Sequence, residues 1–135
     1  MKLFSLVLIL MVTSAVNGEL VVNVQPTKVT GQKAIVPLQI ENNWTHRVES
    51  ARAAVFILDD QGKMVGRSTR WVIGADNESK GLPSGGTNLF YFVVPLEKSV
   101  SHTNITAKVT FTRVVLEGGK LADANKEVKI QLPPK

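Results

Sequence analysis

An apolar run with an abrupt end constrains the fold of this chain more than any other feature. Residues 53–58 read Ala-Ala-Val-Phe-Ile-Leu, and the turn residues Asp59-Asp60-Gln61-Gly62 follow at once. A short apolar run that ends in turn residues is typical of a strand buried on both faces. We therefore predict a central strand that begins near Val48, followed by a type I turn with Asp at its start and Gly at its end.

Similar signals predict further strands on both sides of this one. Pro26 closes the first of them, which favours an edge strand because proline is tolerated at strand edges and ends. The aromatic run Asn88–Val94 is also solidly apolar, so we predict that it is central in its sheet and pairs with the strand at 53–58. The predicted strands other than the central one are 20–24, 33–41, 63–73, 88–94, 104–115 and 127–132.

No long window after Glu19 shows the 3.6-residue apolar period of a helix. About seven strands at regular spacing, separated by Gly and Pro, predict an all-β fold: an immunoglobulin-like, two-sheet antiparallel β-sandwich. The chain has 135 residues, which favours one domain, expected over 19–135.

The first residues predict a secretory signal peptide over 1–18. Lys2 precedes the apolar run Leu3–Val12, and small and polar residues follow up to Gly18. Cleavage after Gly18 is favoured, and cleavage after Ala15 is the alternative. The run has about half the length that a membrane-spanning helix needs. We expect a secreted protein, extracellular or periplasmic, with no transmembrane segment after cleavage.

Composition narrows the classes of partner and of chemistry. Lys2 is the only charged residue in 1–18. Without this segment the chain would have 15 basic and 11 acidic residues, and so a net charge of +4. This charge favours acidic surfaces such as polyanionic glycans or anionic lipid headgroups. The basic residues are dispersed along the sequence among acidic ones, so nucleic acid is not an expected partner. The chain has no cysteine, which excludes disulfides and thiol chemistry.

Several motifs together resemble a known family. Phe56-x-Leu58-x-Asp60, followed by Gly62, is similar to the signature of the FxLYD-type exported immunoglobulin-like domains, and Asp59 stands where that signature has Tyr. The loop 82–87, which contains Pro83-Ser84-Gly85 and leads into Phe90 and Phe92, resembles the next segment of that family. The resemblance spans about 20–132. It implies a sandwich domain on secreted or envelope proteins, and it carries no catalytic residue to this chain.

No pattern in the sequence predicts a catalytic or metal site, and no cofactor is expected. His46 and His102 lie in separate predicted loops, so we expect two unrelated exposed histidines. No Gly-x-Ser-x-Gly motif accompanies the serines. Asp59 and Asp60 are expected to form a turn rather than to bind calcium, and Asp76 is an equally weak calcium candidate.

Two groups of residues are candidates for recognition or modification. Trp44 is expected in an open loop, and Arg67 and Arg70 lie near Trp71; exposed Trp beside Arg is a common recognition pattern. These three residues, Trp44, Arg67 and Arg70, form our candidate binding surface, whereas Trp71 itself is expected to pack in the core. Three Asn-x-Ser/Thr sequons are candidate glycosylation sites: Asn43, Asn77 and Asn104.

Three functions stay open from the sequence. We favour a non-catalytic secreted or envelope-associated module that binds a protein or glycan partner or has a structural role. The alternative is an assembly or adhesion accessory factor that pairs through an exposed edge strand, expected at 20–24 or 127–132. An enzyme would need a concave pocket with converging titratable groups around His46 or His102.

Overall fold

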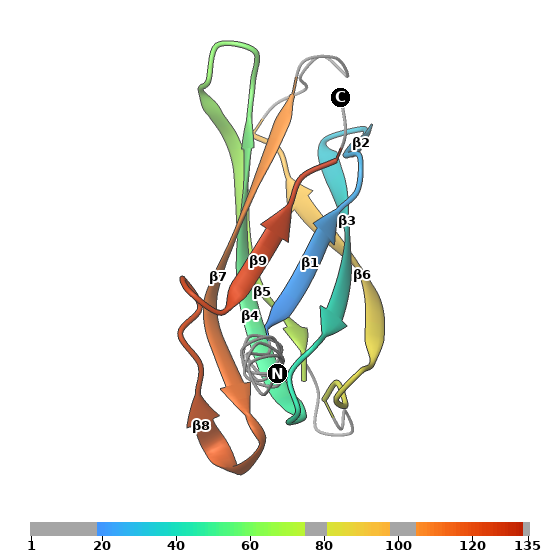
Figure 1. The fold of residues 1–135 in the computed structure, drawn as a ribbon. Coiled ribbons are helices and arrows are strands. Elements are labelled where there is room, and N and C mark those ends of the chain that lie inside the picture. The colour runs from blue at the N-terminus through green and yellow to red at the C-terminus, as the bar shows by residue number, and fades with distance from the viewer. Residues whose placement is uncertain (1–18, 75–80, 98–104, 134–135) are drawn as a thin grey trace, which may run out of the picture.

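A computed structural model describes residues 19–74, 81–97 and 105–133, and these form nine strands in two sheets packed face to face (Figure 1). The expectations for the signal peptide, Asp76, Asn77, His102 and Asn104 lie outside the described residues. The strands are β1 (Leu20–Val24), β2 (Lys28–Thr30), β3 (Lys33–Asn42), β4 (Val48–Leu58), β5 (Met64–Ile73), β6 (Thr87–Pro95), β7 (Thr106–Leu116), β8 (Lys120–Leu121) and β9 (Val128–Gln131). The 3₁₀ turn η1 (Glu117–Gly119) joins β7 to β8.

The two sheets confirm the predicted β-sandwich. In the first sheet β3 pairs with β6 on one side and with β1 and β2 on the other, and β9 lies beyond β1. In the second sheet the order is β5-β4-β7-β8, so β4 is central, as predicted. Every pair is antiparallel except β1 with β9, which run parallel. The two short strands β2 and β8 are additions to the predicted set.

The core lies between the inner faces of the two sheets. Alternate residues of β3 and β4 enter it, because successive strand side chains point to opposite faces. The fully buried side chains of these two strands are Ala34, Val36, Leu38, Ile40, Asn42, Val48, Ala51, Ala53, Val55 and Ile57. The described residues include no helix that is long and apolar enough to cross a membrane.

The predicted positions of two strands are wrong. β1 is not an edge strand, because β3 and β9 flank it. β6 is neither central nor a neighbour of β4; it pairs only with β3 and forms an edge of the other sheet. The apolar run of β6 is misleading because one face of it packs in the core, at Phe92 and Val94, while the other face is partly solvent-exposed.

The turn after β4 has the predicted Asp at its start and Gly at its end. The Gly62 N–H donates to the Asp59 carbonyl at 3.0 Å, and Gly62 has a φ of 80°. The Asp59 side chain, rather than that of Asp60, accepts from the Gln61 and Lys63 N–H groups at 2.9 and 2.8 Å. Both short distances are typical of charge-assisted hydrogen bonds. Asp59 therefore has a turn-forming role, as we expected for this pair.

One buried amide organises the loop between β3 and β4. Asn42 is fully buried, and its Nδ2 donates to the carbonyls of His46 and Leu82, each at 2.9 Å. Its Oδ1 accepts from the Trp44 N–H at 2.9 Å. Since a buried polar group is stable only when hydrogen-bonded, these contacts fix the loop against the Leu82 segment.

Gly81 packs against the start of β4, which gives a testable stability effect. Its φ is +78°, and a Cβ added there would lie 2.2 Å from the Val48 carbonyl oxygen. Gly81→Ala is expected to cost at least about 2 kcal/mol, from the left-handed conformation and the clash with backbone. Gly85→Ala is the matched control, because Gly85 has the same φ and nothing within 4 Å. Urea unfolding of both variants gives the comparison, and equal losses would contradict the close approach.

Candidate functional site

Trp44 does not belong to an exposed surface, so this part of the predicted binding surface is wrong. Its side chain is only 7% exposed and packs in the core cluster. The Asn42 side chain holds the Trp44 N–H, and the Ser84 hydroxyl donates to the Trp44 carbonyl. These two contacts turn the loop inward, and the indole fills the end of the sandwich.

The prediction for Trp71 is wrong in the opposite direction. We expected Trp71 in the core, but it lies half-buried on the outer face of the second sheet. The cause is a β-bulge. Ala51 pairs with Ile73 but Arg52 pairs with Trp71, so Val72 is an extra residue in β5. Val72 and Ile73 are both buried. A prediction that assumes strict alternation of side chains puts Trp71 on the same inner face as Ile73. The extra residue moves it to the outer face.

Arg67 and Arg70 are both exposed, and they lie on different faces of β5. Arg67 pairs with Phe56, and Trp71 with Arg52, all on the outer face. Arg70 pairs with Ala53, whose side chain is fully buried on the inner face. The predicted surface of Trp44, Arg67 and Arg70 is therefore not one surface, and of the three only Arg67 lies on the outer face of the second sheet.

The outer face of β5, β4 and β7 gathers basic, aromatic and hydroxyl side chains. Register places on it three residues from each of β5 and β4 and four from β7, and all of them except the buried Ala54 are at least partly exposed. We call this surface the basic face; it consists of Arg67, Thr69, Trp71, Arg52, Ala54, Phe56, Lys108, Thr110, Thr112 and Arg113. A second bulge, in β7, exposes the neighbours Thr112 and Arg113 together.

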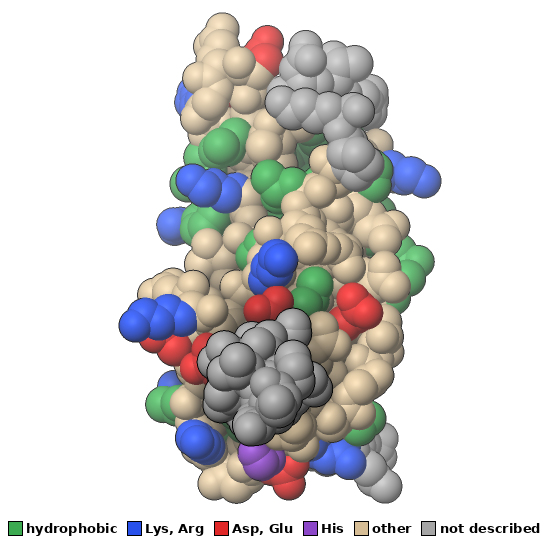
Figure 2. All heavy atoms as spheres, in the orientation of Figure 1, with side chains coloured by type: hydrophobic (Ala, Val, Ile, Leu, Met, Phe, Trp, Pro, Cys, Tyr) green, Lys and Arg blue, Asp and Glu red, His purple; other side chains and the backbone are tan. Residues whose placement is uncertain are grey.

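The basic face carries one sign of charge. No carboxylate occurs in β5 or β7, and in β4 the one carboxylate, Glu49, lies at its beginning. Within the described ranges, none of the four cations of this face forms an ion pair with a carboxylate. The view over β1, β3 and β9 in Figure 2 is different, because Lys or Arg and Asp or Glu side chains are interspersed there.

Arg52 connects the aromatic and hydroxyl parts of the basic face. Its guanidinium lies 5.5 Å from the centroid of the Trp71 ring, within the range of a cation–π contact. Its Nε donates to the Thr112 hydroxyl at 3.0 Å, which in turn lies 3.3 Å from the Arg52 carbonyl. These contacts orient Arg52 across the sheet, so side chains from β5, β4 and β7 form one connected surface.

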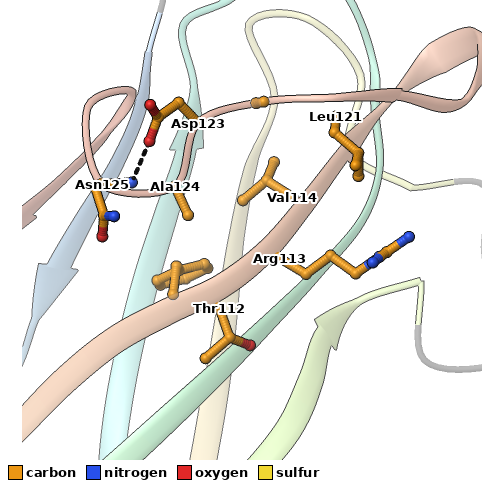
Figure 3. A pocket seen from close by; sticks show the side chains of 9 residues that line it. Thr112, Arg113, Val114, Leu121, Asp123, Ala124 and Asn125 are labelled. Carbon is orange, nitrogen blue, oxygen red and sulfur yellow. Dashed lines mark hydrogen bonds between the residues drawn. The ribbon is translucent and has the colours of Figure 1, made fainter.

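A shallow hollow of about 490 Å³ opens beside this face, between β7 and the segment after β8 (Figure 3). Asp123, one of its walls, accepts from the Asn125 N–H at 2.9 Å and so serves the local turn. The Arg113 guanidinium extends away from Asp123 (Figure 3). No histidine lines the hollow, whose walls are Phe111, Thr112, Arg113, Val114, Leu121, Ala122, Asp123, Ala124 and Asn125.

The remaining predicted site residues lie apart from the basic face. His46 is exposed, and its Nδ1 lies 3.9 Å from a carboxylate oxygen of Glu117. In 19–74, 81–97 and 105–133, no three His, Asp or Glu side chains are placed to hold a metal ion. Asn43, the one sequon inside the described ranges, is exposed, as glycosylation requires.

Sequence reasoning missed Arg52, Lys108 and Arg113 as site residues. They occupy the polar positions of strands whose apolar positions were recognised, and dispersion along the chain concealed their proximity in space. The usable signal is that the strands at 63–73 and 104–115, and the alternate positions 52, 54 and 56, contain basic residues and no acidic one. Strand order was needed to bring these residues together.

Comparison with known proteins supports the fold alone. No family model matches the chain, and no curated protein matches it in sequence. Among solved structures, the ApaA protein from Bordetella pertussis is similar, with a TM-score of 0.52, 19% identity, and coverage of 78% of this chain and 85% of that one. IrmA from Escherichia coli is similar with a TM-score of 0.51, 11% identity, and coverage of 84% and 92%.

Proposed function

We propose that this protein is a non-catalytic, secreted or envelope-associated binding module of the FxLYD-resembling type, and that its basic face binds an acidic polysaccharide. The observation that carries the proposal is the concentration of Arg52, Arg67, Lys108 and Arg113 on one sheet face without an acidic residue among them. Such a surface attracts polyanions at long range and selects against cationic partners.

The aromatic and hydroxyl groups favour a glycan over an acidic protein as the ligand. Trp71 and Phe56 are partly exposed on the face, and rings of this kind present an apolar surface to a sugar. Thr69, Thr110 and Thr112 are exposed between the cations and offer hydroxyls that both donate and accept. Carboxylate or sulfate groups along a polysaccharide would meet the arginines, and the sugar hydroxyls would meet the threonines.

Charge reversal tests the proposal. The double variant Arg67→Glu/Lys108→Glu is expected to weaken binding to heparin and alginate by about a hundredfold, about tenfold for each reversed charge. The control is Arg70→Glu, which changes an exposed arginine of the same strand on its other face and should leave affinity within about twofold. Binding is measured by calorimetry in low salt and should weaken steeply as salt is added.

Three results would contradict the proposal. The first is equal loss in the control and in the face variant, which would mean that net charge alone matters. The second is absence of binding to either polysaccharide. The third is tighter binding of single-stranded nucleic acid than of both glycans, which would indicate a nucleic-acid face instead.

The edge-strand alternative is not supported at the two places where it was expected. β1 is paired on both sides, and β9 is an edge of four residues only. A specific observation favours this alternative at β6, which is a nine-residue edge.

A further inference from the structure

The geometry points to an interface at the free edge of β6, where we propose that a second copy of this chain pairs in antiparallel orientation. β6 pairs with β3 at nine successive positions, from Thr87 to Pro95. Within the described part of the chain, no strand forms a ladder with its other side. This proposal is independent of the basic face, which lies on the other sheet.

Hydrogen bonds show which groups of β6 face outward. The Leu96 N–H donates to the Gln32 carbonyl, and the Asn42 N–H to the Gly86 carbonyl, so even-numbered residues of the two strands bond to each other. The Pro37 carbonyl, opposite Tyr91, accepts from Gln25 on the far side of β3. Because bonded and non-bonded pairs alternate in an antiparallel ladder, Leu89, Tyr91 and Val93 direct their N–H and C=O groups away from β3.

One end of this edge is already occupied. The Glu97 N–H donates to the Val65 carbonyl of β5 at 2.9 Å, and Gly66 of β5 forms a bridge with Leu96. Gly66 also packs closely against Val94 and Pro95, so these contacts occupy the carboxyl-terminal end of β6. They leave the Leu89–Val93 segment as the open part of the edge.

The side chains of β6 lack the features that protect edge strands. Natural edges commonly carry Lys or Arg, which oppose pairing with another chain. Each of the other edges has such a residue: Lys28 in β2, Arg67 and Arg70 in β5, Lys120 in β8 and Lys129 in β9. β6 reads Thr-Asn-Leu-Phe-Tyr-Phe-Val-Val-Pro and has no charge. Two copies of this edge can therefore approach without like-charge repulsion at the contact.

An apolar patch lies beside the open edge. Leu89 is 48% and Tyr91 59% exposed, and apolar side chains are visible at the margin of the molecule along β6 in Figure 2. Val93 shares their face, and the β3 partners of Tyr91 and Val93 are Pro37 and Ile35, both half-buried. Pairing would cover a patch of the kind that marks protein interaction sites.

Pairing of two copies gives partners both to the outward N–H and C=O groups of β6 and to its exposed apolar side chains. A two-fold axis at Tyr91 pairs each Tyr91 with its copy and each Leu89 with Val93 of the other chain. All three positions then exchange N–H···O=C bonds, since these are the residues whose groups face outward. The same register sets apolar side chains opposite apolar side chains. Such an interface is isologous and closes as a dimer.

Sedimentation equilibrium of the purified chain tests the proposal. We expect twice the chain mass for the unaltered protein and the chain mass for Tyr91→Lys, because the axis places two ammonium groups side by side. Thr69→Lys is the matched control: it adds a lysine to the exposed edge strand β5 and should remain dimeric. A monomeric unaltered protein, or a Tyr91→Lys variant that stays dimeric, would overturn the proposal.

Cross-linking tests the register without relying on the stability of one variant. The chain has no cysteine, so Tyr91→Cys can form only an intermolecular disulfide. Directly opposite residues of a bonded pair have Cα atoms about 5.5 Å apart, a distance that a disulfide spans. We expect rapid covalent dimerisation of Tyr91→Cys, and a mixed dimer from Leu89→Cys and Val93→Cys chains. Rates no faster than that of the control Thr69→Cys would overturn the register and the interface.

Discussion

Asn42→Ala is expected to lower the free energy of unfolding by about 3 kcal/mol, a large fraction of the stability of a domain of this size. The alanine removes two donated hydrogen bonds and one accepted one. It leaves the buried Trp44 N–H without its acceptor, while the Leu82 carbonyl keeps only the hydrogen bond from the Val48 N–H. The indole of Trp44 then loses the contact that turns it inward. Urea unfolding followed by tryptophan fluorescence measures the loss.

The control for this prediction is the adjacent residue. Asn43→Ala changes the same residue type at an exposed position and should alter stability by no more than about 0.5 kcal/mol. Asn42→Asp keeps the acceptor for Trp44 but brings a buried carboxylate close to two carbonyl oxygens. Burial raises the pKa of that carboxyl above its unfolded value. The Asn42→Asp variant is therefore more stable in acid, and its free energy of unfolding falls as the pH rises. Equal losses for Asn42→Ala and Asn43→Ala would contradict the loop anchor.

Ile57→Ala is expected to cost about 4 kcal/mol, and Phe56→Ala, although it removes a larger side chain, at most about 2 kcal/mol. Ile57 is fully buried between the sheets, whereas Phe56 is partly exposed on the basic face. A cavity therefore forms only in the first variant. Thermal and urea unfolding of both variants give the two values.

The order of these two losses is the informative result. A greater loss for Phe56→Ala would show that the outer face of β4 is covered in solution. The two residues are adjacent in one strand, so differences in local strand propensity contribute little to the comparison.

Much of the fold could be predicted from hydrophobic patterns. The alternation in 33–41 and 104–115 identified β3 and β7, and the run ending at Asp59 identified β4 as a central strand. The position of β6 could not be predicted in the same way. An apolar run shows that residues avoid water on average, but it does not distinguish a strand between two neighbours from an edge strand with one exposed apolar row.

The site was less predictable because it depends on local irregularity and on strand order. A single extra residue, Val72, moves Trp71 from the expected core to the outer face. A single buried amide, Asn42, moves Trp44 the other way. Neither the β-bulge at Val72 nor the buried amide of Asn42 produces a periodic pattern of apolar residues in the sequence. The gathering of Arg52, Lys108 and Arg113 followed only once β5, β4 and β7 were known to be neighbours.

The parallel pairing of β1 with β9 has a mechanical consequence. These are the first and last strands of the described fold, and they pair in register from Leu20 with Val128 to Asn23 with Gln131. Tension applied between the residue before β1 and the residue after β9 pulls two parallel strands in opposite directions along their length. All their interstrand hydrogen bonds are then loaded in shear together, whereas an antiparallel pair pulled from adjacent ends opens one bond at a time. The parallel pairing of β1 with β9 is thus the strand contact best placed to resist extension of the chain.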